Sequence, residues 1–154
     1  MKRLGLIGSV ALALACGGPI GPLAGGELSG TAATAALEPA LVEDVTQVQL
    51  ETNPDAPHSV NTWIGAASGA VYVPTSMIRG PLSPAERDWV KNVQADPRVR
   101  LRVDGTLYAL RATRVEDAAE YEAARAALEA KYELGADDMD PAREIWLFRL
   151  EARE

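Results

Sequence analysis

The sequence contains one cysteine, Cys16, and one histidine, His58. A single cysteine excludes an intramolecular disulfide framework and any paired-cysteine redox or zinc motif. A single histidine excludes a metal site built from several histidines, and no nucleophile partner for His58 is recognisable. Basic residues are also scarce: 15 Lys and Arg against 22 Asp and Glu give a net charge of −7. An acidic chain repels phosphate backbones, so we expect no nucleic-acid partner.

Long hydrophobic runs are absent as well. The apolar stretch 4–14, about eleven residues, is shorter than the roughly 20 needed to span a bilayer. It follows Lys2 and Arg3, which is typical of a secretory signal. The stretch Leu12–Cys16 resembles a bacterial lipobox, so we expect a lipoprotein signal peptide over 1–15. Cys16 would then be lipidated and would anchor the protein to a membrane of the cell envelope, on the periplasmic or extracytoplasmic side. The alternative is an ordinary signal cut after an alanine.

The residues after Cys16 are mostly Gly, Ala, Pro, Thr and Ser. Such a composition buries too little apolar surface to offset the entropy lost on ordering. We therefore expect residues 16–43 to form a lipidated, flexible linker. The folded domain is expected over 44–154, a length that suits one ordinary domain.

Three strands are predicted early in this domain. Residues 45–52 are rich in β-branched side chains, and a proline-rich loop follows them. Residues 60–66 and 70–74 form two further strand candidates around Ser68-Gly69, which is typical of a hairpin turn. The loop 75–82 comes next.

A helix and a hairpin are predicted next. Ser83 is the expected N-cap of the helix, with Pro84 at its first position and Glu86 three residues after the cap. A second hairpin joins 98–103 to 106–115 through Asp104-Gly105. Closing it there pairs Val103 with Thr106, Leu101 with Tyr108 and Val99 with Leu110.

The chain is expected to end with a long helix over 116–134 and a strand over 144–151. This order of elements predicts the α+β class: an antiparallel, barrel-like sheet with two packed helices. The acidic turn around Asp138 lacks the spacing of a calcium loop, and we expect no metal site.

One face of the second hairpin carries arginines, namely Arg98, Arg100, Arg102 and Arg111. We expect this face to be solvated or covered by the acidic residues of the long helix. Each exposed ion pair of that kind contributes only about 0–1 kcal/mol. The alternative is a site for phosphate or another anion.

Short motifs within 60–115 resemble the flavin- and deazaflavin-binding split β-barrels. That group includes pyridoxamine-phosphate-oxidase-like proteins and deazaflavin-dependent nitroreductases. A strand ends in Ser76, a basic residue and a glycine follow at Arg79 and Gly80, and a helix carries Trp89 and Asn92. The resemblance implies a split antiparallel β-barrel and, by analogy with relatives that pair across the sheet, a homodimer.

The resemblance also implies a cofactor, FMN or a deazaflavin. Ser76, Arg79 and Gly80 match positions that hold its phosphate-bearing tail, and a cation beside a glycine suits an anion. Trp89 and Asn92 match helix positions of the family, whereas Trp63 could face the cofactor ring. The alternatives are a plain surface loop and two ordinary core tryptophans.

Two functions stay open. One is a membrane-tethered, nitroreductase-like oxidoreductase in which the cofactor carries the hydride and acts on a small-molecule ligand. The other is a cofactor-free envelope lipoprotein that serves as a binding or scaffolding module. An exported chain must also find its cofactor outside the cytoplasm, so fold alone does not give activity. The surroundings of Arg79 and Gly80 distinguish between the two functions. A cofactor binder has these residues beside an open groove with an aromatic ring, whereas a scaffold has a filled groove.

Overall fold

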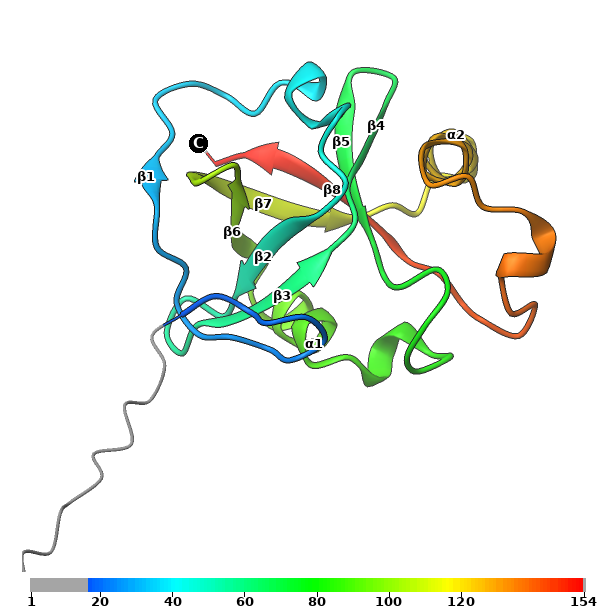
Figure 1. Ribbon diagram of the computed structural model, residues 1–154, viewed down its shortest axis with the longest axis horizontal. Coiled ribbons are helices and arrows are strands. Elements are labelled where there is room, and N and C mark those ends of the chain that lie inside the picture. The colour runs from blue at the N-terminus through cyan, green and yellow to red at the C-terminus, as the bar shows by residue number, and fades with distance from the viewer. Residues whose placement is uncertain (1–16, 154) are drawn as a thin grey trace, which may run out of the picture.

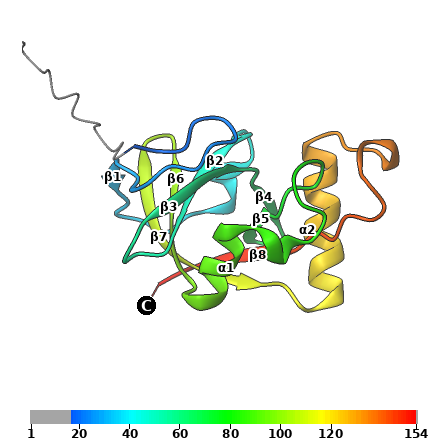
Figure 2. The ribbon, with the colours of Figure 1, turned by 90° about the horizontal axis from the view of Figure 1, so that it is seen from below.

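A computed structural model describes residues 17–153 of the chain. The expected signal peptide over 1–15 and the lipidation site Cys16 lie outside the described residues. The described part is a curved sheet with one helix, α1 (Asp88–Ala95), near its open end and a second, α2 (Ala118–Lys131), at its side (Figures 1 and 2). Three short 3-10 turns connect these elements: η1 (Pro39–Val42), η2 (Pro84–Glu86) and η3 (Ala136–Asp138).

In the described part of the chain, eight strands form the sheet, in the spatial order β3-β2-β6-β7-β8-β5-β4, and β1 pairs with β7 in parallel. All other pairings are antiparallel. The strands are β1 (Thr31–Ala32), β2 (Val48–Thr52), β3 (His58–Thr62), β4 (Gly65–Ala67), β5 (Ala70–Pro74), β6 (Arg98–Val103), β7 (Thr106–Arg114) and β8 (Leu147–Ala152). The α+β split barrel with two helices is thus confirmed.

The hairpin of β6 and β7 forms with the expected register. Val103 lies opposite Thr106, Leu101 opposite Tyr108 and Val99 opposite Leu110. The inward side chains of β2, β6, β7 and β8 form a core that is closed by Trp89 of α1. A second apolar cluster, which includes Leu128 of α2, joins α2 to β4, β5 and the start of β8.

The two helices differ from expectation in where they begin. Asp117 caps α2, its carboxylate accepting a hydrogen bond of 2.8 Å from the amide of Glu120. At the other helix the expected cap is wrong: the Ser83 side chain makes no capping bond, and only the turn η2 follows it. The backbone of Arg87 is extended (φ −80°, ψ 130°), which ends that turn, so α1 starts at Asp88.

The segment 17–43 lies against the barrel, which corrects the expectation of a flexible linker. Residues 17–26 form a short N-terminal hairpin, closed by hydrogen bonds between Ile20 and Leu23 and from the amide of Gly26 to the carbonyl of Gly17. Gly25 pairs with Ser59 of β3, and Leu28 is buried. The reason is that the segment's backbone groups find partners on the sheet, so little side-chain burial is needed.

On the arginine face, Arg98 and Arg111 are exposed, as expected, whereas the same segment, and not the long helix, covers Arg100 and Arg102. Arg100 donates to the carbonyl of Leu28, and Arg102 donates to the carbonyl of Ser29. The acidic helix α2 instead places Glu120 2.6 Å from Arg149 of β8. Position across the sheet explains this result, because α2 packs mainly against β4, which lies four strands away from β6.

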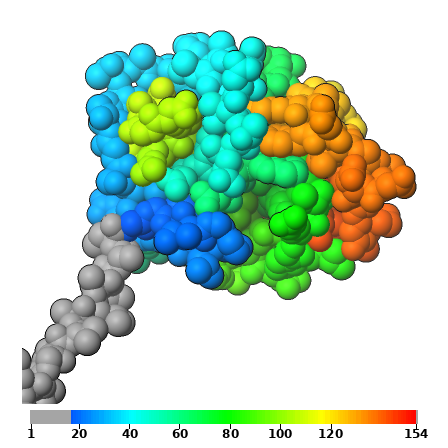
Figure 3. All heavy atoms as spheres, in the orientation of Figure 1, coloured from blue at the N-terminus to red at the C-terminus, as the bar shows by residue number. Residues whose placement is uncertain are grey.

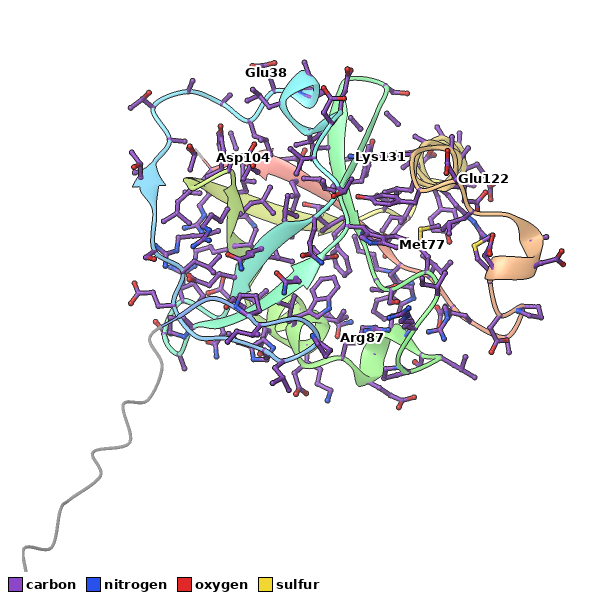
Figure 4. The ribbon with its side chains drawn as sticks, viewed as in Figure 1. Glu38, Met77, Arg87, Asp104, Glu122 and Lys131 are labelled. Carbon is purple, nitrogen blue, oxygen red and sulfur yellow. The ribbon has the colours of Figure 1, made fainter. Side chains whose placement is uncertain are left out.

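Lys131 at the end of α2 ties the helix to the barrel (Figure 4). Its ammonium donates to the carbonyls of Val42, Val45 and Ile64 at 2.6, 2.6 and 2.9 Å. Burial lowers the pKa of this ammonium.

Within residues 17–153, no helix is long and apolar enough to cross a membrane, and no cluster of His, Cys, Asp and Glu has the make-up of a metal site.

Candidate cofactor-binding cleft

A cleft opens between the N-terminal hairpin, β3 and the loop that leads from β5 to α1. Figure 3 shows the hollow between the blue N-terminal segment and the green segment around residue 80. Its inner part has a volume of about 140 Å³, and the wider mouth has one of about 580 Å³. The inner lining is formed by Gln47, Asn61, Thr62, Trp63, Pro74, Ser76, Arg87 and Trp89.

The loop after β5 is built to hold its carbonyl groups in fixed positions. The hydroxyl of Ser76 accepts a hydrogen bond of 2.9 Å from the amide of Arg79, which closes the first turn. Gly80 has a φ of +79°, a backbone conformation that residues other than glycine rarely adopt. Arg143, from the segment before β8, donates to the carbonyls of Arg79, Gly80 and Pro81 at 3.0, 3.1 and 2.9 Å.

Arg87 brings a second guanidinium to this loop (Figure 4). It is half-buried, and its Nη2 donates to the carbonyl of Arg79 at 2.7 Å. Burial, together with repulsion from Arg143, lowers the pKa of Arg87. No carboxylate of residues 17–153 lies within ion-pair distance of Arg79, Arg87 or Arg143. The loop therefore concentrates positive charge that the described residues leave uncompensated.

Two tryptophans form the inner wall of the cleft. Trp63 stacks on Tyr132, with ring centroids 4.2 Å apart and planes inclined by 8°. Trp89 packs edge-on against Phe148 at 5.4 Å and is only 6% exposed. Each ring therefore packs on the core on one side and borders the cleft on the other.

The structure brings five of the six predicted site residues to one place. Trp63, Ser76 and Trp89 line the inner cleft, while Arg79 and Gly80 line its mouth. Asn92 lines neither part. Its amide donates 3.0 Å to the hydroxyl of Thr52, because its position on α1, one turn after Trp89, faces β2.

Sequence reasoning missed Arg87, Asn61 and Gln47. Arg87 lies in the first turn of the expected helix, where the sequence pattern predicts an ordinary exposed helical residue. Asn61 lies on β3 and Gln47 lies directly before β2. The pairing of β2 with β3 places both residues at the cleft, and no short sequence motif indicates the register of that pairing.

Chemically, the groove is open, aromatic and free of acidic side chains among its lining residues. A Cβ atom at Gly80 would lie 2.8 Å from Nη2 of Arg87. The loop backbone therefore approaches that guanidinium more closely than a side chain at residue 80 would allow. The Nε of Arg143 is buried and has no hydrogen-bond partner among the described residues. The guanidinium groups of Arg79 and Arg87 and the rings of the two tryptophans fit a ligand with an anionic tail and a flat ring.

Solved structures share this fold at low sequence identity. An F420-H2-dependent reductase matches with a TM-score of 0.53 and 20% identity over 70% of this chain and 95% of its own. A conserved hypothetical protein from Mycobacterium tuberculosis matches at 0.53 and 18%, over 75% and 78% of the two chains. A candidate pyridoxamine 5'-phosphate oxidase from Listeria innocua matches at 0.52 and 15%, over 75% and 90%.

At these identities, the three likenesses establish the fold alone. No curated protein matches the chain. A family model described as F420H(2)-dependent quinone reductase matches residues 60–146, which contain all six of the predicted site residues. Because this match extends over more than half of the sequence, the chain belongs to the F420H(2)-dependent quinone reductase family.

Proposed function

We propose that the protein binds a reduced deazaflavin in the cleft and serves as a reductase for a quinone-class acceptor while anchored to a membrane through Cys16. The observation that carries the proposal is that Arg79 and Arg87 line an acid-free cleft, with Arg143 behind the same loop, in a protein of net charge −7. Charges of one sign held together cost free energy unless an anion accompanies them.

The chain's own residues would divide the work between tail and ring. Arg79 and Arg87 would bind the anionic tail, with the amide and carbonyl groups of the loop held in place by Arg143. Trp63 and Trp89 would exclude water from the ring, and the amides of Asn61 and Gln47 would orient its polar edge. The cofactor, when bound, supplies the hydride.

The open groove favours this function over the cofactor-free scaffold. A scaffold would fill the space beside Arg79 and Gly80 with side chains, whereas here that space is hollow and bordered by Trp89. Family membership supports a deazaflavin rather than FMN, and the name of the family supports a quinone acceptor.

The test is cofactor binding by the purified protein, followed by the fluorescence of F420 and, separately, of FMN. We expect saturable F420 binding that weakens at least tenfold in Arg79→Ala and in Arg87→Gln. Arg111→Gln is the matched control, because Arg111 is an exposed arginine on β7, away from the cleft. Preference for FMN would overturn the deazaflavin assignment, and failure to bind either cofactor would favour the scaffold.

Anchoring is tested separately. We expect the mature N-terminal peptide to begin with Cys16 and to carry the mass of attached lipid. A Cys16→Ala variant should then leave the membrane fraction. A mature chain that begins at another residue, or with unmodified Cys16, would contradict the anchor. Purification from the native membrane also shows whether the exported protein carries a deazaflavin.

A further inference from the structure

The N-terminal hairpin 17–26 presents apolar side chains to solvent at the mouth of the cleft. Ile20 is 78% exposed and Leu23 is 69% exposed, the two highest values among the exposed large hydrophobic residues described. The hairpin contains no charged residue, although the protein as a whole is strongly acidic. A neutral, apolar tip of this kind is suited to contact with a lipid surface.

The hairpin is fixed to the barrel and forms part of the cleft. Asn61 of β3 donates 3.0 Å to the carbonyl of Gly21, and Gly25 pairs with Ser59 of the same strand. Gly21, Pro22 and Leu23 line the mouth, opposite Arg79 and Gly80. Leu82, also exposed, lies in the loop across the cleft, two residues after Gly80. Three of the four exposed large hydrophobic residues among those described therefore flank the cleft.

The described chain begins at Gly17, one residue after Cys16. Ile20 is the fourth residue after Cys16, a span of at most about 14 Å. A lipid attached to Cys16 would therefore keep the hairpin close to the headgroups, since the segment after Cys16 is packed on the barrel. The exposed apolar tip and the proposed lipid lie at the same end of the chain.

From this arrangement we infer that Ile20 and Leu23 insert into the membrane surface and turn the mouth of the cleft toward the bilayer. The inference rests on the proposed function for its anchor and its acceptor, and it narrows the acceptor to a quinone dissolved in the lipid. Such a molecule would enter the cleft beside Leu23 without first crossing water.

The test uses the full chain, purified from bacterial membranes and reconstituted into vesicles of phosphatidylethanolamine and phosphatidylglycerol. Lipidation consumes the thiol of Cys16, the only cysteine, so Leu23→Cys supplies a single site for a fluorophore. Leu41→Cys is the matched control, because Leu41 is an exposed leucine on η1, at the far end of the barrel from the hairpin (Figure 1). Phospholipids carrying a nitroxide then quench whichever probe touches the bilayer.

We expect quenching at residue 23 to exceed quenching at residue 41 at least threefold, and a probe at residue 20 to behave like that at 23. Equal quenching would overturn the inference. Cross-linking of Leu23→Cys to itself would also overturn it, by assigning the tip to a second copy of the chain. F420 binding and the mass of the N-terminal peptide are measured on the same sample. If both are as expected while quenching is equal, only the orientation fails; if Cys16 is unmodified, the anchor fails with it.

Discussion

Glu51 and Arg100 form a two-point ion pair across the neighbouring strands β2 and β6. Nε and Nη2 of Arg100 each lie 2.7 Å from a different carboxylate oxygen of Glu51, whose side chain is only 5% exposed. The same carboxylate accepts a hydrogen bond from the amide of Leu28. One buried acid thus joins the sheet to the segment that precedes it.

Glu51→Gln is therefore expected to lower the free energy of unfolding by about 2 kcal/mol, because it leaves the guanidinium without its counter-charge. Urea denaturation measures the loss, and faster hydrogen exchange at the Leu28 amide locates it. Glu27→Gln is the control: Glu27 is an exposed partner of the same arginine at 3.4 Å, so we expect a change below about 0.5 kcal/mol. Equal effects in the two variants would contradict the role given to burial.

Gly→Ala changes at two glycines with the same backbone angle can separate the effect of backbone strain from the effect of side-chain contact. Gly69 and Gly80 both have a φ of +79°, but a Cβ at Gly69 meets nothing within 4 Å, whereas one at Gly80 meets Arg87. Each Gly→Ala change should cost about 1 kcal/mol in strain. Only Gly80→Ala should also weaken cofactor binding, at least tenfold, because Arg87 must move. Thermal melting and F420 titration of both variants provide the comparison, and equal affinities would refute the contact.

The hydroxyl of Tyr132 is a further link between α2 and the barrel. It lies 2.9 Å from the amide of Ile64 and 2.8 Å from the carbonyl of Thr46. Tyr132→Phe keeps the stack on Trp63 and leaves the Ile64 amide without its acceptor, so we expect a loss of about 1–2 kcal/mol in unfolding free energy. Tyr108→Phe, at a half-buried tyrosine on β7, should be nearly neutral when measured by urea denaturation in parallel.

Alkaline pH should destabilise the fold through Tyr72. Its burial, and its hydrogen bond of 3.0 Å to Glu120, raise the pKa of the Tyr72 phenol to about 12. The unfolded chain loses this proton near pH 10, while the folded chain keeps it, so stability is full below pH 10 and falls as pH rises toward 12. The fall attributable to this group is about 2 kcal/mol. Urea unfolding of Tyr72→Phe between pH 9 and 12 should show a shallower decline than the parent protein.

Much of the sheet could be predicted because its signals are local. The arginine-apolar alternation of 98–103 and the turn Asp104-Gly105 fix both the hairpin and its register within one stretch of sequence. The segment 17–43 could not be predicted in this way. Its ties are backbone groups that pair with residues far along the chain, as Gly25 does with Ser59, and glycine-rich composition does not encode such partners.

The candidate site likewise has one part that local sequence predicts and one part that it does not. Ser76, Arg79 and Gly80 form a contiguous loop, so a short motif reveals them together. Arg87 is revealed only by the geometry, because its function depends on one extended residue between η2 and α1 that directs its guanidinium to the loop. A helix-start pattern read from sequence places this residue inside a helix.

The pairing of Gly25 with Ser59 also has a consequence for solubility. β3 is one edge of the sheet, and exposed edges of this kind invite strand-by-strand aggregation. The amide and the carbonyl of Ser59 are both occupied by Gly25, so the N-terminal segment blocks that edge near the start of β3. A fragment that starts at residue 44 would uncover the edge and strip Leu28 from its buried position. We expect such a fragment to self-associate, and preparations intended to stay monomeric should retain the chain from Gly17 onward.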